Sequence, residues 1–319
     1  MAVRDTFGRE ITYLRLSVTD FCNLRCRYCM PEEGVIRRRH DEMLSEDEMI
    51  LAVETAASLG VRKVRITGGE PLVKKNILSI CGRTAAVPGV EEVCLTTNGT
   101  LLPELAVPLR KAGVSRVNIS LDTLDPEKYA AVTRVGRLDA ALAGIEAALS
   151  AGFDKVKINT VLVGGFNEDE IPALAELTRD RPVDVRFIEL MPTRGQSGFG
   201  PEAFIPDGRV LAALPDLIRL PDEEGTAELW QLPGAAGRIG LISPVYRHFC
   251  RKCNRLRLTA DGKLKPCLHS ADEYPIKGLS PSEMREQFLR AIAEKPEMHA
   301  DFAGGERSGA ARSMNRIGG

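Results

Sequence analysis

The chain has 319 residues, of which 44% are hydrophobic and 27% charged, an ordinary composition for a globular protein larger than one small domain. The formal net charge of −1 excludes a protein held to nucleic acid or membrane by its overall charge, so any anion site must be a local cluster of basic residues. No apolar run is long enough to span a bilayer, and the opening MAVRDTFGRE lacks the apolar segment of a signal peptide. We therefore expect a cytoplasmic protein.

Strand-like and helix-like segments alternate from residue 11 to about residue 190. Amphipathic segments at 45–59, 101–112 and 138–151 predict helices, and the glycines in SLG, KAG and SAG predict where helices end. Stretches rich in Val, Ile and Leu predict six strands, at 11–19, 61–69, 90–98, 114–122, 155–163 and 183–190. This alternation predicts a parallel sheet with helices outside it. Six units are too few for a closed eight-stranded barrel, so a partial barrel and a doubly wound sheet both stay open.

Polar, glycine-rich and acidic residues recur where these strands end, in TDFC, TGGEP, TTNG, SLD and IELM. Function in parallel α/β folds gathers at the carboxyl ends of strands. The first cysteine run, Cys22, Cys26 and Cys29, leaves the first strand at this edge, so we expect these segments to face one cavity.

The three cysteines form a C-x3-C-x2-C run with Tyr28 before the last thiol. Zinc sites and iron–sulfur clusters usually use four protein ligands. Three thiolates would leave one metal position open, and we expect the chemistry there. The alternatives are a structural zinc knuckle and an incidental cluster of cysteines. The isolated Cys81 and Cys94 fit buried hydrophobic positions instead.

Residues 191–245 are richer in Pro and Gly, and we predict two domains, 1–195 and 196–319. The second contains a hairpin turn centred on Asp261-Gly262, a helix at 280–294 and a tail that should be flexible by itself.

A second cysteine set, Cys250, Cys253 and Cys267, has C-x2-C-x13-C spacing. His269 nearby makes a Cys3His zinc site as plausible as an iron–sulfur cluster from the residues alone. The same segment is strongly basic, which fits a solvated face, a nucleic-acid contact or a polyphosphate pocket. Its basic residues are Arg247, Arg251, Lys252, Arg255 and Arg257.

The first cysteine run resembles the signature of the radical S-adenosylmethionine (SAM) superfamily. With RITGGEPL, LTTNGTLL, VNISLDTL, FIELMP, CNRLRLTADGKLKPCL and the closing IGG, the chain resembles the molybdenum-cofactor biosynthesis protein A family of GTP 3′,8-cyclases from about residue 4 to its last residue. The resemblance implies an α/β fold, an incomplete (β/α)6 TIM-like barrel with a C-terminal iron–sulfur module. SAM would bind at one end of the barrel and GTP at the other.

The resemblance also assigns residues. Two [4Fe–4S] clusters would be held by Cys22, Cys26 and Cys29 and by Cys250, Cys253 and Cys267. SAM would contact Tyr28, Gly69, Ser120 and Met191. GTP would contact Arg15, Arg65, Thr96, Lys157, Arg255, Leu256 and Arg257. Catalysis would depend on Arg255, Arg257, Gly318 and Gly319, with the tail threaded into the barrel. Arg15, Arg65 and Lys157 interrupt otherwise apolar strands, although strand alternation also permits each to point to solvent.

The implied activity is that of a lyase, in which a SAM-derived 5′-deoxyadenosyl radical converts GTP to (8S)-3′,8-cyclo-7,8-dihydroguanosine 5′-triphosphate, the first step of molybdenum cofactor biosynthesis. It implies an external one-electron donor, a downstream cyclic pyranopterin monophosphate synthase and a homodimer. Three other classes stay open. They are a radical SAM enzyme with another substrate, a two-cluster electron carrier, which would need eight cysteine ligands where six are counted, and a non-enzymatic zinc module.

Overall fold

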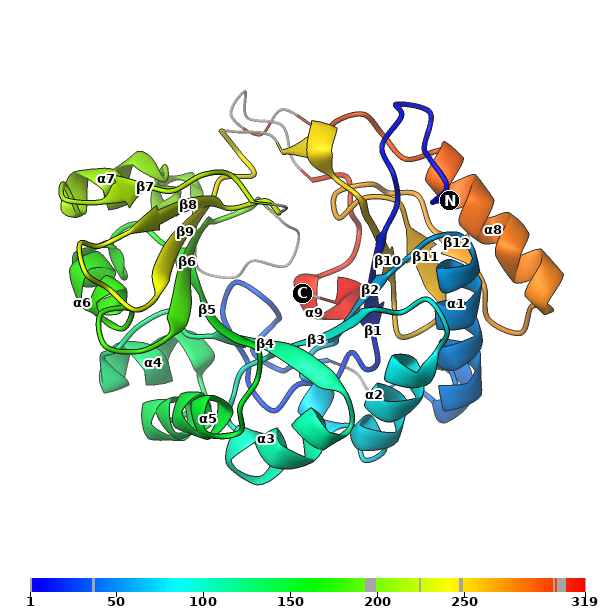
Figure 1. Ribbon diagram of the computed structural model, residues 1–319, viewed down its shortest axis with the longest axis horizontal. Coiled ribbons are helices and arrows are strands. Elements are labelled where there is room, and N and C mark those ends of the chain that lie inside the picture. The colour runs from blue at the N-terminus through cyan, green and yellow to red at the C-terminus, as the bar shows by residue number, and fades with distance from the viewer. Residues whose placement is uncertain are drawn as a thin grey trace.

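Six parallel strands follow one another in chain order through the middle of the sheet (Figure 1). A computed structural model describes residues 2–35, 38–192, 199–223, 225–246, 249–300, 302 and 308–318. The strands coincide with the six predicted ones: β1 (Tyr13–Ser17), β2 (Lys63–Thr67), β3 (Glu92–Thr97), β4 (Val114–Ser120), β5 (Lys155–Leu162) and β6 (Val183–Glu189). Because their spatial order equals their sequence order, the sheet winds as a barrel does and not as a doubly wound sheet, whose order reverses.

Helices cover the outside of this curved sheet (Figure 1). They are α1 (Glu46–Ser58), α2 (Ile77–Ala86), α3 (Leu102–Lys111), α4 (Pro126–Thr133), α5 (Leu138–Ser150), α6 (Ile171–Glu176), α7 (Gly208–Ala213) and α8 (Pro281–Ala293). Local sequence sets their ends: α1 and α8 both begin with a capping box, formed by Ser45 with Glu48 and by Ser280 with Glu283. The three glycines predicted to end helices all have left-handed φ, at Gly60, Gly113 and Gly152.

The core lies between the strands and this helical layer. It contains the apolar strand residues, with Leu14, Val64 and Leu95 fully buried. Cys81 on α2 and Cys94 on β3 are both 0% exposed, as predicted for small apolar residues.

The second half of the chain extends both edges of the same sheet. Beyond β6 lie β9 (Arg238–Ile242), β8 (Glu228–Gln231) and β7 (Ile218–Arg219), and beyond β1 lie β10 (Arg255–Leu258), β11 (Lys263–Lys265) and β12 (Tyr274–Pro275). Among the described residues the sheet therefore has twelve strands and stays open. The predicted α/β class, an incomplete barrel with a C-terminal addition, is confirmed.

The predicted hairpin is formed by β10 and β11, which pair antiparallel on either side of Gly262 at φ +76°. The domain boundary between 195 and 196 stays a prediction, since residues 193–198 lie outside the described ranges. The short helix α9 (Met314–Ile317) lies inside the arc of strands (Figure 1), so the tail is ordered there. No helix in the described ranges is both long and apolar enough to cross a membrane.

Candidate active site

The first three cysteines lie in a loop that leaves the carboxyl end of β1. Backbone bonds from Arg25 N to Thr133 O and from Arg27 N to Val132 O attach this loop to the end of α4. Within it, Cys29 N donates to Cys26 O at 2.9 Å and forms a tight turn. All three thiols are free, so one short segment presents three sulfur ligands.

This donor set fits a thiolate-bound iron–sulfur cluster. Burial raises the pKa of Cys22 to about 11 and that of Cys29 to about 12, and it raises the pKa of Cys26 as well. Such thiols ionise only beside a strong positive charge, which iron supplies. In the described part of the chain, no three His, Cys, Asp or Glu side chains converge as they would around one metal ion. A four-iron cluster is larger and spreads its thiolates over separate irons.

The TGGEP segment after β2 lies directly against the cysteine loop. Gly69 N donates to Thr19 O at 2.7 Å, and Glu70 N donates to Phe21 O at 2.9 Å. A Cβ at Gly69 would lie only 2.5 Å from Phe21 O, so glycine is required for this close approach. The buried Glu70 carboxylate accepts hydrogen bonds from Leu72 N, Thr97 Oγ1 and Asn98 N, which joins the ends of β2 and β3.

The other predicted SAM contacts lie at the same edge of the sheet. Ser120 is the last residue of β4, and Met191 closely follows β6. Tyr28 Oη donates to Asp122 Oδ2 at 2.5 Å, which fixes the aromatic ring of the cysteine loop to the segment after β4. Four residues that the family resemblance assigned to SAM thus lie at or after the ends of four strands at one edge of the sheet, and their shared role stays a prediction.

Six basic side chains gather further down the inner face of the strands, and we call them the basic cluster. Arg15 on β1 stands opposite Arg65 on β2 and Arg257 on β10 in the parallel ladders. Arg65 Nη1 reaches Thr96 Oγ1, at 3.4 Å, so two of the predicted GTP contacts are neighbours. Arg65 and Lys157 are buried, and the other members are partly buried. The basic cluster consists of Arg15, Arg65, Lys157, Arg186, Arg255 and Arg257.

The basic cluster has more positive charge than nearby carboxylates can neutralise. Burial and the charge of Arg257 lower the pKa of Arg15 to about 9, and burial and Arg65 lower that of Arg186 to about 10. Lys157 pairs with Asp184 at 3.0 Å, yet burial and Arg186 lower its pKa to about 7. Mutual repulsion of this kind is relieved by a polyanion bound among the side chains.

Unused hydrogen-bonding atoms support the same conclusion. Among the described residues, the buried Nε atoms of Arg15, Arg186 and Arg255 have no hydrogen-bond partner. The amide oxygens of Asn118 and Asn159, on β4 and β5, are equally buried and unpartnered. Buried polar groups without partners are rare in proteins unless a ligand completes them.

Sequence reasoning missed Arg186, Asn118 and Asn159 as site residues. A usable signal existed for Arg186, which interrupts the apolar stretch VDVRFIEL as Arg15 and Arg65 interrupt theirs. Leu256, predicted to contact GTP, is 0% exposed in the hydrophobic core, so any contact would have to come from its backbone.

The second cysteine set lies at the opposite end of β1 from the first. Because β10 runs parallel to β1, Cys250 and Cys253 precede it at the amino end, and Cys267 follows the antiparallel β11 back to that end. Lys295 Nζ donates to both Arg255 O and Pro266 O, joining the two segments. Burial raises the pKa of the Cys253 thiol, but the Lys295 and Arg255 cations outweigh it and lower that pKa overall.

His269, considered as a zinc ligand, shares a hydrogen bond between its Nδ1 and Ser308 Oγ at 3.1 Å. Its ring also packs edge-on against Phe302. Arg247 lies outside the described residues, as does Gly319.

Gly318 lies at the carboxyl ends of β1 and β2. Its φ is +87°, and a Cβ there would come within 2.8 Å of both Ser17 Cβ and Thr67 Oγ1. Arg257 Nη1 donates to Gly318 O at 3.0 Å. The tail therefore touches the basic cluster and the strand end next to the cysteine loop.

Comparisons with known proteins agree with this arrangement. Residues 16–178 match the Radical SAM superfamily, and residues 183–301 match a family described as Molybdenum Cofactor Synthesis C. Proteins named GTP 3′,8-cyclase from Alkaliphilus metalliredigens and Pelotomaculum thermopropionicum are 44% and 46% identical, each over 99% of this chain and 100% of the relative. The protein of that name from Heliobacterium modesticaldum is 48% identical over 99% of both chains.

Solved structures are similar in fold alone. Streptococcus suis SuiB aligns with a TM-score of 0.63 at 15% identity, over 91% of this chain and 68% of that one. Methylornithine synthase (PylB) aligns with a TM-score of 0.50 at 15% identity, over 97% and 81% of the two chains.

Proposed function

Because the chain belongs to the GTP 3′,8-cyclase family of the radical SAM superfamily, we propose that it converts GTP to (8S)-3′,8-cyclo-7,8-dihydroguanosine 5′-triphosphate. This reaction is the first step of molybdenum cofactor biosynthesis, and the enzyme is a lyase. It uses a [4Fe–4S] cluster and SAM, and an external donor supplies the electron.

The basic cluster is the observation that carries this proposal. It combines six basic side chains, unpartnered guanidinium nitrogens and a position between two cysteine sets. A nucleoside triphosphate supplies the negative charge that the cluster lacks, and arginines bind phosphate oxygens with two parallel hydrogen bonds. The unpartnered amide oxygens of Asn118 and Asn159 can accept hydrogen bonds from ribose hydroxyls or purine N–H groups.

Cys22, Cys26 and Cys29 would hold the cluster that binds SAM, with Tyr28, Gly69, Ser120 and Met191 around the cofactor. When bound, the cluster and SAM supply the radical that removes hydrogen from C3′ of the ribose. The chain itself positions the substrate and shields the reacting atoms from water. Arg15, Arg65, Lys157 and Thr96 would hold the triphosphate so that C3′ faces the first cysteine loop. Arg255, Arg257, Gly318 and Gly319 would stabilise the reacting nucleotide.

Cys250, Cys253 and Cys267 would hold a second [4Fe–4S] cluster that binds the purine. The lowered pKa of Cys253 favours a thiolate there, as metal binding requires. A homodimer, a cytoplasmic location and transfer of the product to a cyclic pyranopterin monophosphate synthase belong to the same proposal.

Anaerobic reconstitution tests it. We expect about eight irons per chain, because each of two clusters has four, and GTP-dependent formation of the cyclised product with 5′-deoxyadenosine. Half that iron together with one zinc would favour the Cys3His site. Deoxyadenosine without cyclised product, even in wild-type protein, would favour a radical SAM enzyme with another substrate.

A further inference from the structure

Residues 308–318 lie inside the arc of strands, although a chain terminus is usually loosely attached (Figure 1). Asn315 and Ile317 are each 1% exposed. Both belong to α9, which has only four residues, and a helix this short does not form by its own hydrogen bonds. Tertiary contacts must therefore hold the tail.

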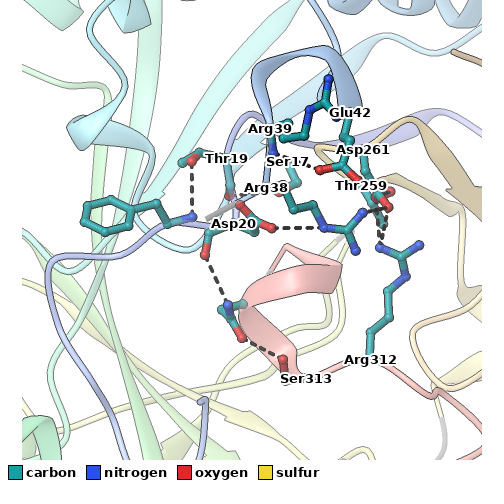
Figure 2. A network of polar contacts seen from close by, with 12 residues as sticks. Ser17, Thr19, Asp20, Arg38, Arg39, Glu42, Thr259, Asp261, Arg312 and Ser313 are labelled. Atoms are coloured by element: carbon teal, nitrogen blue, oxygen red, sulfur yellow. Dashed lines mark hydrogen bonds and ion pairs between the residues drawn. The ribbon is translucent and has the colours of Figure 1, made fainter. Parts of the chain in front are cut away.

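Arg312, two residues before α9 begins, makes four of these contacts (Figure 2). Its Nη1 donates to both carboxylate oxygens of Asp261, at 2.8 and 2.9 Å. Its Nε and Nη2 each donate to Glu273, both at 2.6 Å. The side chain is only 14% exposed, so these charge-assisted bonds are shielded from water.

Asp261 connects the tail to the loop that follows the first cysteines. Arg38 Nη1 donates to Asp261 Oδ2 at 2.7 Å, and Thr259 Oγ1 donates to Asp261 Oδ1 at 2.6 Å (Figure 2). The Arg38 Nε atom also lies 3.6 Å from Asp20 Oδ2. We call Arg312, Asp261, Glu273 and Arg38 the clasp.

The clasp also meets the segment that enters the cysteine loop. Asp20 lies two residues before Cys22, and its carbonyl oxygen accepts a hydrogen bond from Asn315 Nδ2 at 3.1 Å. Asn315 Oδ1 in turn accepts from Ser313 Oγ at 2.8 Å (Figure 2). The tail is therefore attached on both sides of the first cysteine run, at Asp20 before it and through Arg38 after it.

We propose that Arg312 is a positioning residue for the cyclisation: by bridging Asp261 and Glu273 it seats Gly318 at the ends of β1 and β2, where Arg257 binds its carbonyl oxygen. This inference rests on the proposed function. It assigns to Arg312 no contact with substrate or cofactor, and its effect on the reaction passes through Gly318.

The first measurement follows the tail itself in reconstituted holoenzyme. Trypsin cutting after Arg316 releases residues 317–319, and mass spectrometry gives the rate. Loss of buried, charge-assisted hydrogen bonds should speed this release roughly 10- to 100-fold in Arg312→Gln. Arg312→Lys keeps the charge but not the planar geometry, so its rate of tail release should lie between those of wild type and Arg312→Gln. Arg137→Gln is the matched control, because it removes an arginine–carboxylate pair whose side chains are 80% and 64% exposed. It should release the tail at the wild-type rate.

The second measurement is the ratio of cyclised product to 5′-deoxyadenosine during anaerobic turnover. Arg312→Gln should lower this ratio while iron content and the KM for GTP stay at wild-type values, and Arg312→Lys should restore part of it. Wild-type tail release in Arg312→Gln, or faster release with an unchanged ratio, would overturn the inference. A wild-type protein that makes no cyclised product would refute the proposed function instead, and the release rates would still show whether the clasp holds the tail.

Discussion

Arg15 on β1 and Arg257 on β10 are direct neighbours in a parallel ladder, although they come from opposite ends of the sequence. Burial and then the charge of Arg257 lower the pKa of Arg15 to about 9, while burial and then the charge of Arg255 lower the pKa of Arg257 to about 10. Two buried like charges repel each other and destabilise the folded protein, and a bound ligand or partner of opposite charge removes this cost. The predictions below test what that ligand is and how the fold presents it.

Arg186→Ala should weaken GTP binding by roughly 10- to 100-fold, since a charge-assisted hydrogen bond contributes about 1.5–3 kcal/mol. SAM binding should not change. Anaerobic titration calorimetry with each ligand measures both affinities. Arg110→Ala provides the control, because Arg110 pairs with Asp154 on the outer surface and should have no effect. Equal GTP affinity in wild type and Arg186→Ala would exclude Arg186 from the site.

Lys157, whose pKa is about 7, should lose its charge first and weaken GTP binding, and the affinity for GTP should fall further as the pH rises through about 8, because of Tyr13. Its Oη accepts a hydrogen bond from Arg65 Nε at 2.5 Å. Burial raises the pKa of Tyr13, but the arginines outweigh burial and lower it to about 8. The phenolate repels phosphate, so GTP binding favours the protonated phenol and takes up a proton above pH 8. The basic groups around the ring are Arg65, Arg15, Arg255, Arg186, Arg257 and Lys63, and the Cys94 thiol also lies near it.

Tyr13→Phe tests this pH dependence. The variant should lose the fall in GTP affinity near pH 8, which wild type should show as up to about tenfold per pH unit. Stability of the ligand-free protein should change in the opposite sense. The folded-state pKa lies below the unfolded one, so ionisation of Tyr13 adds stability as the pH rises above 8. Identical GTP profiles for the two proteins would assign the pH dependence to other groups.

Mutations in the two cysteine sets should have different effects on the products, because the two sets lie at opposite ends of β1. Cys26→Ala should abolish 5′-deoxyadenosine formation, since the SAM-binding cluster loses one of three ligands. Cys250→Ala should keep part of the SAM cleavage but stop cyclisation. Anaerobic turnover with chromatography of both products measures the difference. Normal SAM cleavage by Cys26→Ala, or normal cyclisation by Cys250→Ala, would contradict the assignment of that set.

Gly69→Ala should destabilise the protein by about 1–3 kcal/mol, as overpacking against backbone does. The new Cβ would lie 2.5 Å from Phe21 O and 2.7 Å from Asp20 O, so the cysteine loop must move. Both the midpoint temperature of thermal unfolding and the amount of iron that the protein retains should fall. Gly208→Ala is the control, because a Cβ there meets nothing within 4 Å. Equal midpoints and iron contents for Gly69→Ala and wild type would disprove this close packing.

Local pattern in the sequence determined the strands β1–β6, the principal helices and both cysteine sets. Hydrophobic periodicity, helix-ending glycines and cysteines close together in the chain are all read over short distances, where the chain leaves few alternatives. The resemblance to a known family rested on the same short motifs and identified the chemistry.

Only the tertiary structure decided which side chains share a site. Strand alternation allowed Arg15, Arg65 and Lys157 to face either inward or outward, and a shift of one residue would have exchanged the two faces. The helices that cover the outer face of the sheet leave these side chains on the inner one, and the pairing of β10 with β1 places Arg257 beside Arg15, while Leu256 is buried in the core. The same long-range pairing brought Asp261 to Arg312. Contacts between residues so distant in sequence depend on the assembly of the whole sheet, and no local pattern specifies them.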